Sequence, residues 1–381
     1  MPAPRPLLRF LLGSAAVAAL VHCQAETAPL TPLAWTKVSG PAPNGALLGP
    51  GTTGAFDERA NFTTGALPDG GRIRLYYGGS DASGACAGIS GSHWRIGLAD
   101  SADGVSFTRV AGSQAGGAMI DNGAIGQFDS QLTYRPNVLR DVLPTGAVLY
   151  RMWFNGSTMP FNCPAGTLAN DRRIGYAEST DGLSWTKHYD GDGPGGSVLP
   201  LGVPGAIDAQ QVGYVWVIKD GAEYKMYYSA NDATNTWRVA LATSTDARHW
   251  AKVPGKLAGG AILDVGPAGS FDFACAYQPS VVKEGDQLYR MWYRGCVAPG
   301  PFGGPSKGTI GYAESNDGIT WIKIRQPTPD GSALGVGPAG EFDSGGLTTP
   351  SVFLDASGWN MYYAGFDTTG KYSAGLARAP R

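Results

Sequence analysis

Five aspartates recur along the chain at similar intervals, and repeated carboxylates could serve as general acids, bases or nucleophiles. They are Asp57, Asp129, Asp208, Asp272 and Asp343, separated by 72, 79, 64 and 71 residues. An aspartate that recurs in every repeat can instead cap the turn in which it stands. Both interpretations are open. We take Asp57, Asp129, Asp208 and Asp272, together with Glu58, as candidate catalytic residues.

Two repeats depart from the common pattern within three residues after the aspartate. A Glu-Arg pair follows Asp57 in the first repeat, and a Gln-Gln pair follows Asp208 in the third. A specific site is more readily expected where a repeat is broken than where it is kept. These departures therefore favour Asp57, Glu58 and Asp208 over the other aspartates.

The segments between the aspartates are copies of one unit. IGYAESTDGLSW at 174–185 returns as IGYAESNDGITW at 310–321, and weaker copies lie at 96–107 and 239–250. A run rich in Tyr and Trp precedes each copy, and a fifth such run begins at Trp359. Each unit predicts four short strands. Units of this length repeated along a chain are typical of a β-propeller.

The fifth unit ends without a fourth strand, and the missing piece stands at the other end of the chain. AWTK at 34–37 matches SWTK at 184–187. We therefore expect an all-β, five-bladed β-propeller over residues 33–381. Its blades are four-stranded, and the N-terminal strand completes the last blade and closes the ring.

The repeated string also contains an Asp followed by Gly or Ala, and then Trp or Phe at the end of the string. Asp-Gly pairs favour tight turns because Gly adopts positive φ and Asp binds turn amides. The pattern resembles the Asp-box of sialidase-type propellers. We expect a structural role for the four aspartates, and we expect the aromatic residue to pack between blades. These aspartates are Asp103, Asp181, Asp246 and Asp317.

Composition and the N-terminus bear on location. The formal net charge of −2 provides no basic field that would attract nucleic acid. Arg5 and Arg9 precede the apolar run FLLGSAAVAALV, which predicts a signal peptide over residues 1–25. LVHC, ending in Cys23, also resembles a lipobox. We expect a secreted or periplasmic protein, with an outer-membrane lipoprotein anchored at Cys23 as the alternative.

Four cysteines follow the signal peptide, an even number that suits disulfides in an exported protein. Cys275 and Cys296 flank a turn expected at 284–286, so they should face each other across neighbouring strands. Cys86 and Cys163 fall in loops of adjacent blades, where a bridge could staple the loops together. We expect both bridges to be structural.

The fivefold repeat, the YRMWY runs, the IGYAES strings and the Phe-Asp pairs together resemble the five-bladed propeller glycosidases. This superfamily includes arabinanases, xylosidases, levansucrases and invertases, and the resemblance spans about residues 33–381. It implies catalysis by carboxylates around the channel, one acting as base or nucleophile and one as acid. In arabinanase-like members the base is an Asp directly before a Pro. Here Arg135, Gln278 and Thr349 stand before the matching prolines.

The resemblance also implies a carbohydrate ligand at the mouth of the channel. Polar residues there could bind sugar hydroxyls, and Trp94 or Trp237 could stack on a sugar face. Alternatively, each of these residues is an exposed loop residue that contacts no ligand. The candidate substrate-binding residues are Arg59, Trp94, Tyr134, Arg135, Gln210, Tyr277, Gln278 and Arg294.

The residues leave two functions open. The first is an exported glycoside hydrolase-like enzyme that acts on a poly- or oligosaccharide through the mouth carboxylates. The second is a non-catalytic carbohydrate-binding or surface-interaction propeller. His93, His188 and His249 have no metal-ligand spacing, so we expect no metal and no cofactor, with a structural calcium in the channel left open. We expect a monomer.

Overall fold

The computed structural model describes residue 1 and residues 32–81, 93–159, 171–298 and 307–381. In these residues the regular structure is β-strand, apart from 3-10 turns of three residues such as η1 (Pro43–Gly45) and η2 (Ala115–Gly117). The all-β prediction is confirmed. No helix in the described part of the chain is long and apolar enough to cross a membrane.

Antiparallel pairing joins the strands into groups of four that follow the order of the chain. The first group is β2 (Ala60–Asp69), β3 (Arg72–Asp81), β4 (His93–Ser101) and β5 (Thr108–Val110). The second is β6 (Leu132–Val142), β7 (Val148–Ser157), β8 (Arg173–Ser179) and β9 (Thr186–His188). The third is β10 (Gln211–Asp220), β11 (Glu223–Asn231), β12 (Trp237–Ser244) and β13 (Ala251–Val253). The fourth is β14 (Cys275–Lys283), β15 (Tyr289–Cys296), β16 (Gly308–Ser315) and β17 (Ile322–Lys323).

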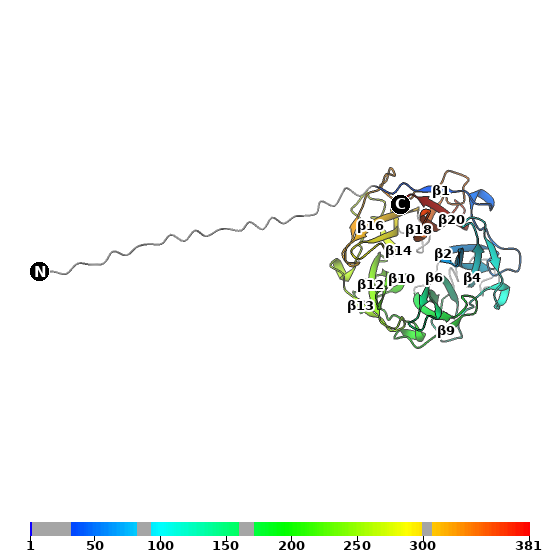
Figure 1. Ribbon diagram of the computed structural model, residues 1–381, viewed down its shortest axis with the longest axis horizontal. Helices are drawn as coiled ribbons and strands as arrows, with labels where there is room; N and C mark the ends of the chain where they lie inside the picture. Colours follow the sequence, from blue (N-terminus) through cyan, green and yellow to red (C-terminus); the bar gives the residue numbers. More distant parts are fainter. Residues whose placement is uncertain (2–31, 82–92, 160–170, 299–306) are drawn as a thin grey trace. The chain divides into compact units, whose positions relative to one another are not determined.

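The last group takes one strand from the start of the described domain. Its order is β1-β20-β19-β18, with β18 (Gly346–Asp355), β19 (Gly358–Phe366), β20 (Tyr372–Ala379) and β1 (Thr36–Val38). Thr36 pairs with Arg378, and Val38 pairs with Leu376. The predicted pairing of the segment around Trp35 with the last β-segment is therefore present. In Figure 1 the first strands of the groups, β2, β6, β10, β14 and β18, face one another around a common axis.

The second strand of each group is buried on both faces, which explains its run of large apolar side chains. In β15, Met291 and Tyr293 pack into one apolar cluster while Trp292, between them, packs into another. The alternation of side chains along a strand sends successive residues to opposite faces. The core of the domain therefore lies between neighbouring groups.

The Asp-box turns have the structural role predicted for them. The Asp181 carboxylate accepts hydrogen bonds from the backbone amides of Leu183 and Ser184 at 2.7 and 2.8 Å, and Gly182 adopts φ = 73°. The amides of Ser184 and Leu183 lower the pKa of Asp181 to about 2. The same amide contacts recur at Asp103, Asp246 and Asp317.

The aromatic residue after each Asp-box turn packs edge-on against an aromatic ring on the second strand of the preceding group. Trp185 contacts Tyr76 with ring centroids 5.8 Å apart. The other pairs of this kind are Phe107 with Tyr362, Trp250 with Trp153, Trp321 with Tyr227, and Trp35 with Trp292. The predicted packing is confirmed, and the N-terminal Trp35 makes the same contact as its counterparts.

Cys275 and Cys296 form the predicted disulfide, and they are paired residues in the β14–β15 hairpin. Cys86 and Cys163 lie outside the described residues, as do residues 2–25 of the predicted signal peptide, including Cys23. The Cys275–Cys296 bridge spans 21 residues of sequence.

Removing the Cys275–Cys296 bridge should lower stability without unfolding the protein. For a closed loop of this length, we expect the free energy of unfolding to fall by about 3 kcal/mol in a Cys275→Ser/Cys296→Ser variant. Urea unfolding followed by tryptophan fluorescence measures the change. An unchanged midpoint would show that the bridge contributes nothing to stability.

Candidate functional site

The aspartates that precede the first strands are buried against a tyrosine and a cation. The Tyr228 hydroxyl donates to Asp208 at 3.0 Å, and Lys252 Nζ lies 2.6 Å from the same carboxylate. We call this arrangement an aspartate clamp. Its other members are Asp57 with Tyr77 and Arg109, Asp129 with Tyr189 and Lys187, Asp272 with Tyr293 and Lys323, and Asp343 with Tyr363 and Lys37.

The clamps leave their carboxylates little access to solvent. Asp57, Asp129 and Asp343 are 0% exposed, and Asp208 and Asp272 are 4% and 2% exposed. Burial, followed by the charge of Asp208, raises the pKa of Tyr228 well above its ordinary value, so this hydroxyl stays a neutral donor. The clamps fasten the segment before the first strand to the fourth strand and, outside the second group, also to the second strand. The geometry therefore favours the structural alternative for the aspartates over the catalytic one.

The remaining predicted residues of these segments lie at the surface or half-buried. Glu58 is half-buried, and its carboxylate accepts a hydrogen bond from the backbone amide of Gly54 at 2.7 Å. Arg59 is also half-buried, and Gln210 is exposed. Glu58 is thus the one predicted catalytic carboxylate that belongs to no aspartate clamp.

The residues that come together at the channel are four non-glycine residues at one repeated position of the first strands. Arg135, Tyr214, Gln278 and Thr349 have φ of 56°, 47°, 56° and 48°. Each stands where the pairing with the second strand shifts register, as at a β-bulge. Positive φ costs a non-glycine residue about 1–3 kcal/mol, and such strain clusters at functional sites.

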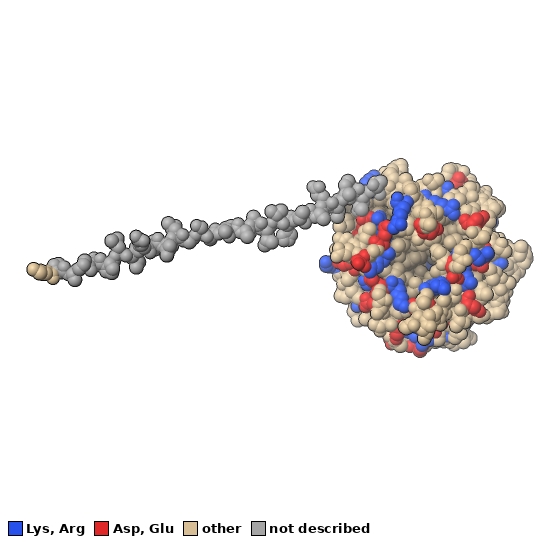
Figure 2. Space-filling view, in the orientation of Figure 1, with Lys and Arg blue, Asp and Glu red and all other residues tan. Residues whose placement is uncertain are grey.

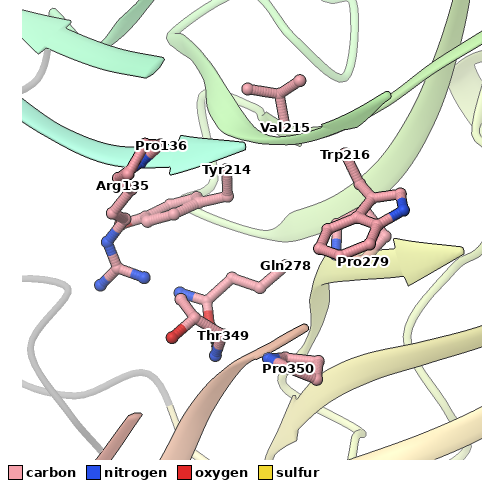
Figure 3. A pocket seen from close by; sticks show the side chains of 9 residues that line it. All are labelled: Arg135, Pro136, Tyr214, Val215, Trp216, Gln278, Pro279, Thr349 and Pro350. Carbon is pink, nitrogen blue, oxygen red and sulfur yellow. Dashed lines mark hydrogen bonds between the residues drawn. The ribbon is translucent and has the colours of Figure 1, made fainter. Parts of the chain in front are cut away.

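These four residues line a hollow that is open to solvent. Figure 3 shows them around it, with the side chains of Arg135 and Gln278 extending toward the same space. Figure 2 shows the described domain hollowed at its centre, with charged side chains of both signs around the hollow. No carboxylate lines this pocket among the described residues. The complete lining is Arg135, Pro136, Tyr214, Val215, Trp216, Gln278, Pro279, Thr349 and Pro350.

Arg135 is 8% exposed and is held by aromatic rings. Its guanidinium carbon lies 4.4 Å from the ring centroid of Phe62 and 4.3 Å from that of Tyr214. Gln278 is 2% exposed, and its carbonyl accepts the backbone amide of Thr349 at 3.0 Å. The amide nitrogen of Gln278 therefore points away from the group that its oxygen binds.

Two further buried arginines stand beside the pocket. Arg172 donates to the Tyr134 hydroxyl at 2.9 Å and to the Gln211 side chain at 2.6 Å. Arg294 donates to the Tyr277 hydroxyl at 2.8 Å. The structure thus brings together five of the predicted substrate-binding residues. Arg135 and Gln278 line the pocket, Tyr134 and Tyr277 bind the two further arginines, and Arg294 is one of these. The Arg135 guanidinium lies 5.7 Å from the Tyr134 ring.

The three arginines act together on Tyr214. Burial raises the pKa of Tyr214, but Arg172, Arg135 and Arg294 outweigh it, so the pKa lies below its ordinary value. A tyrosine hydroxyl with this bias is a good hydrogen-bond donor to an incoming acceptor. Sequence reasoning missed both Tyr214 and Arg172. Tyr214 occupies the same repeat position as Arg135 and Gln278, and this register was the signal that could have found it.

Trp94 and Trp237 pack against the aromatic rings next to the pocket. Trp94 is 5% exposed and packs on Phe62, while Trp237 is 7% exposed and stacks on Tyr277 at 5.2 Å between centroids. Because so little of either indole is exposed, neither ring offers a sugar much surface for stacking. Their placement favours a supporting role for the aromatic wall.

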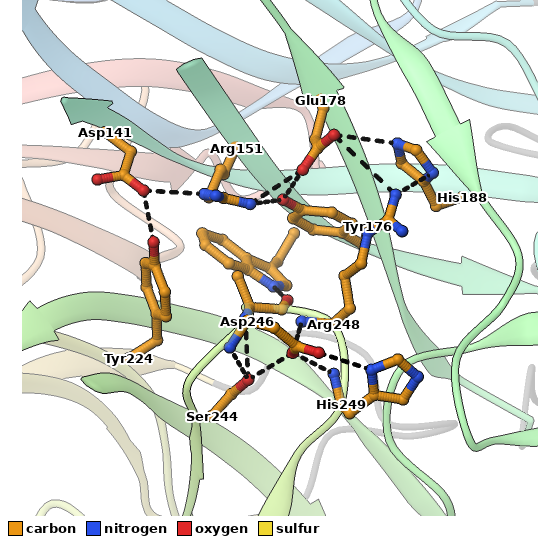
Figure 4. Close-up of polar contacts among 12 residues, drawn as sticks. Asp141, Arg151, Tyr176, Glu178, His188, Tyr224, Ser244, Asp246, Arg248 and His249 are labelled. Carbon is orange, nitrogen blue, oxygen red and sulfur yellow. Dashed lines mark hydrogen bonds and ion pairs between the residues drawn. The ribbon is translucent and has the colours of Figure 1, made fainter. Parts of the chain in front are cut away.

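Glu178 and the histidines lie outside the lining of the channel pocket. Figure 4 shows Glu178 bonded to Arg151, Tyr176 and His188. His249 is exposed and binds Asp246 of an Asp-box turn at 2.8 Å. His93 lies 3.9 Å from Asp81. No group of three or more metal-ligating side chains occurs within the described ranges.

Comparison with known sequences gives relatives without an established activity. No family model matches the chain. Proteins described as uncharacterised in two strains of Mycobacterium tuberculosis, CDC 1551 / Oshkosh and H37Rv, are 28% identical over 261 residues. The match covers 67% of this chain and 74% of theirs.

Comparison with solved structures decides the fold. A glycoside hydrolase superposes with a TM-score of 0.63 at 16% identity, covering 90% of this chain and 93% of that one. The chain has the fold of the propeller-type glycoside hydrolases. A structure from the mannoside phosphorylase family, described as containing hydrolases that target β-1,2-mannosidic linkages in Candida mannan, gives a TM-score of 0.60 at 17% identity, covering 90% and 93%.

A thermostable family-43 glycoside hydrolase gives a TM-score of 0.54 at 16% identity, covering 86% of this chain and 91% of that one. The second and third neighbours are described as members of different families, and all three superpose on this chain over most of its length. The predicted resemblance to the glycosidase propellers is therefore confirmed at the level of the fold.

Proposed function

We propose that this protein is a carbohydrate-binding propeller of the glycoside hydrolase type, whose saccharide is held in the channel pocket. The observation that carries the proposal is the cluster of Arg135, Tyr214 and Gln278. These three side chains from different groups converge at strained, buried positions of a fold whose solved neighbours are glycoside hydrolases. Guanidinium, amide and phenol groups suit the hydroxyls of a sugar.

The proposal includes five blades and a closed ring. Two hydrogen bonds between the first and last groups support closure: the Ala66 amide donates to Ser351 Oγ at 3.0 Å, and the Tyr362 hydroxyl donates to the Gly104 carbonyl at 2.8 Å. The contact of Trp35 with Trp292 repeats the contact made by the corresponding aromatic residue of every other group. The same aromatic contact therefore joins every group to the one before it, including the first group to the last.

Hydrolysis is the second candidate function. The fold and the neighbours favour it, and Glu58 is a half-buried carboxylate outside the clamps. The absence of a carboxylate from the pocket lining, within the described residues, favours binding without cleavage. Acid–base hydrolysis of a glycoside usually requires two carboxylates that flank the bond, about 5–10 Å apart.

Export belongs to the same proposal. An exported propeller with a disulfide-pinned hairpin suits a ligand outside the cytoplasm. We propose a monomer that is secreted or periplasmic, with a lipid anchor at Cys23 as the alternative.

A glycan array followed by a cleavage assay tests the function. We expect the full mature chain to bind at least one class of plant or microbial glycan and to release no reducing ends from it. Release of reducing ends, lost by about a hundredfold or more in Glu58→Gln, would instead establish the hydrolase. Failure to bind any glycan would contradict both candidates.

A further inference from the structure

The channel pocket contains hydrogen-bond donors that the described protein does not use. Nε and Nη1 of Arg135 are buried and have no hydrogen-bond partner among the described residues. The side-chain nitrogen of Gln278 is also buried and also has no hydrogen-bond partner among the described residues. Arg135 also forms no ion pair with a carboxylate in the described part of the chain. Two residues that line one hollow thus present unused donors and no matching acceptor.

Holding Arg135 in this way is costly for a folded protein. A buried cation without a counter-ion is strongly unfavourable. Its contacts with the rings of Phe62 and Tyr214 return only about 0.5–2 kcal/mol each. The residue is also strained at φ = 56°, which glycine would tolerate without cost. Two penalties at one residue are consistent with a side chain that is kept for a ligand.

The surroundings reinforce the positive charge. The Arg172 guanidinium carbon lies 5.6 Å from the centroid of the Tyr214 ring, on which Arg135 also stacks. Arg294 binds Tyr277, and the rings of Tyr277 and Tyr214 meet edge-on at 5.5 Å. The pKa of Tyr214, lowered against the effect of its burial by these three arginines, is what a concentrated positive field would produce.

We propose that the pocket is a subsite for an acidic saccharide, in which the carboxylate of a uronic acid accepts hydrogen bonds from Arg135 and Gln278. Guanidinium groups match the two oxygens of a carboxylate, and charge-assisted bonds of this kind are about twice as strong as neutral ones. The anion supplies the acceptor that both buried donors lack. This inference rests on the proposed function, because it assumes that the ligand of the pocket is a sugar.

Isothermal titration calorimetry with matched sugars tests the subsite. The probes are glucuronic acid and galacturonic acid, their neutral counterparts glucose and galactose, and inorganic phosphate. For the full mature chain, we expect at least one uronic acid to bind about tenfold or more tightly than its neutral counterpart, as expected for a charged hydrogen bond. Added salt should weaken the binding of the acidic sugar and leave the binding of the neutral sugar unchanged.

Two variants of Arg135 and one control locate the effect. Arg135→Met should abolish the preference for the acidic sugar. Arg135→Gly should do the same in a chain that folds at least as well, since glycine adopts this φ freely. Arg140→Met, on the same strand β6 but paired with Asp69 outside the pocket, should keep the preference.

The outcomes separate this inference from the proposed function. Equal binding of acidic and neutral sugars, or a preference that survives in Arg135→Gly, would overturn the acidic subsite and leave carbohydrate binding intact. Phosphate that binds as tightly as the uronic acid would also overturn it, by showing a site for a free anion. Binding of none of the sugars would count against the proposed function itself.

Discussion

A chain that begins at Gly40 is expected not to fold, whereas a chain that begins at Pro32 should unfold like the full mature protein. The shorter chain lacks β1 and with it Lys37, which lies 2.6 Å from the buried carboxylate of Asp343. Breaking a buried pair by removing one partner costs about 3–5 kcal/mol. Loss of the aromatic side chain of Trp35, which packs on Trp292, adds about 1.5–3 kcal/mol.

Together these losses approach the whole stability of a typical domain, about 5–15 kcal/mol. Circular dichroism and thermal unfolding of the two shortened chains measure the difference. The matched control is Lys37→Met in the full mature chain, which removes the ion pair and keeps the strand. This variant should fold, with a free energy of unfolding lower by about 3 kcal/mol.

The outcome also bears on ring closure. If β1 completes the last group, its loss exposes the edge of β20 and should promote aggregation as well as unfolding. A chain from Gly40 that melts within about 2 °C of the chain from Pro32 would contradict closure by the N-terminal strand.

Asp208→Ala is expected to lower the free energy of unfolding by about 3 kcal/mol, because it leaves Lys252 without its buried counter-ion and Tyr228 without its acceptor. The matched control is Asp343→Ala. Asp343 has the same two kinds of partner in the last group. Urea unfolding should give a similar loss for both variants.

A double-mutant cycle with Lys252→Met identifies the clamp as the cause. If the pair is the source of the loss, the double variant should be more stable than the sum of the single losses predicts. Full stability of Asp208→Ala, with glycan cleavage abolished, would contradict the clamp and restore the catalytic interpretation of this aspartate.

Much of the fold could be predicted from the sequence because its determinants are local. The Asp-box turn, the aromatic second strand and the pairing of Cys275 with Cys296 each depend on residues within one repeat. The match of AWTK to SWTK also placed Trp35 and Lys37 correctly. Lys37 occupies the position in its clamp that Lys187 occupies in the clamp of Asp129.

The site was harder to predict because its parts come from different repeats. Arg135 and Tyr214 lie 79 residues apart, and the left-handed backbone that brings them to the pocket cannot be read from side-chain types. The partners of the aspartates were missed for a different reason. Their partners, such as Lys252 for Asp208, lie at the end of the same repeat, so the clamp is visible only when the fourth strand is paired.

The most direct test of the central claim is a crystal structure of the protein with the glycan that binds most tightly. We predict a sugar residue in the channel, with Arg135 and Gln278 within hydrogen-bond distance of it and its carboxylate, if it carries one, on the guanidinium. A glycan bound elsewhere, without contact to Arg135 or Gln278, would contradict the assignment of the site.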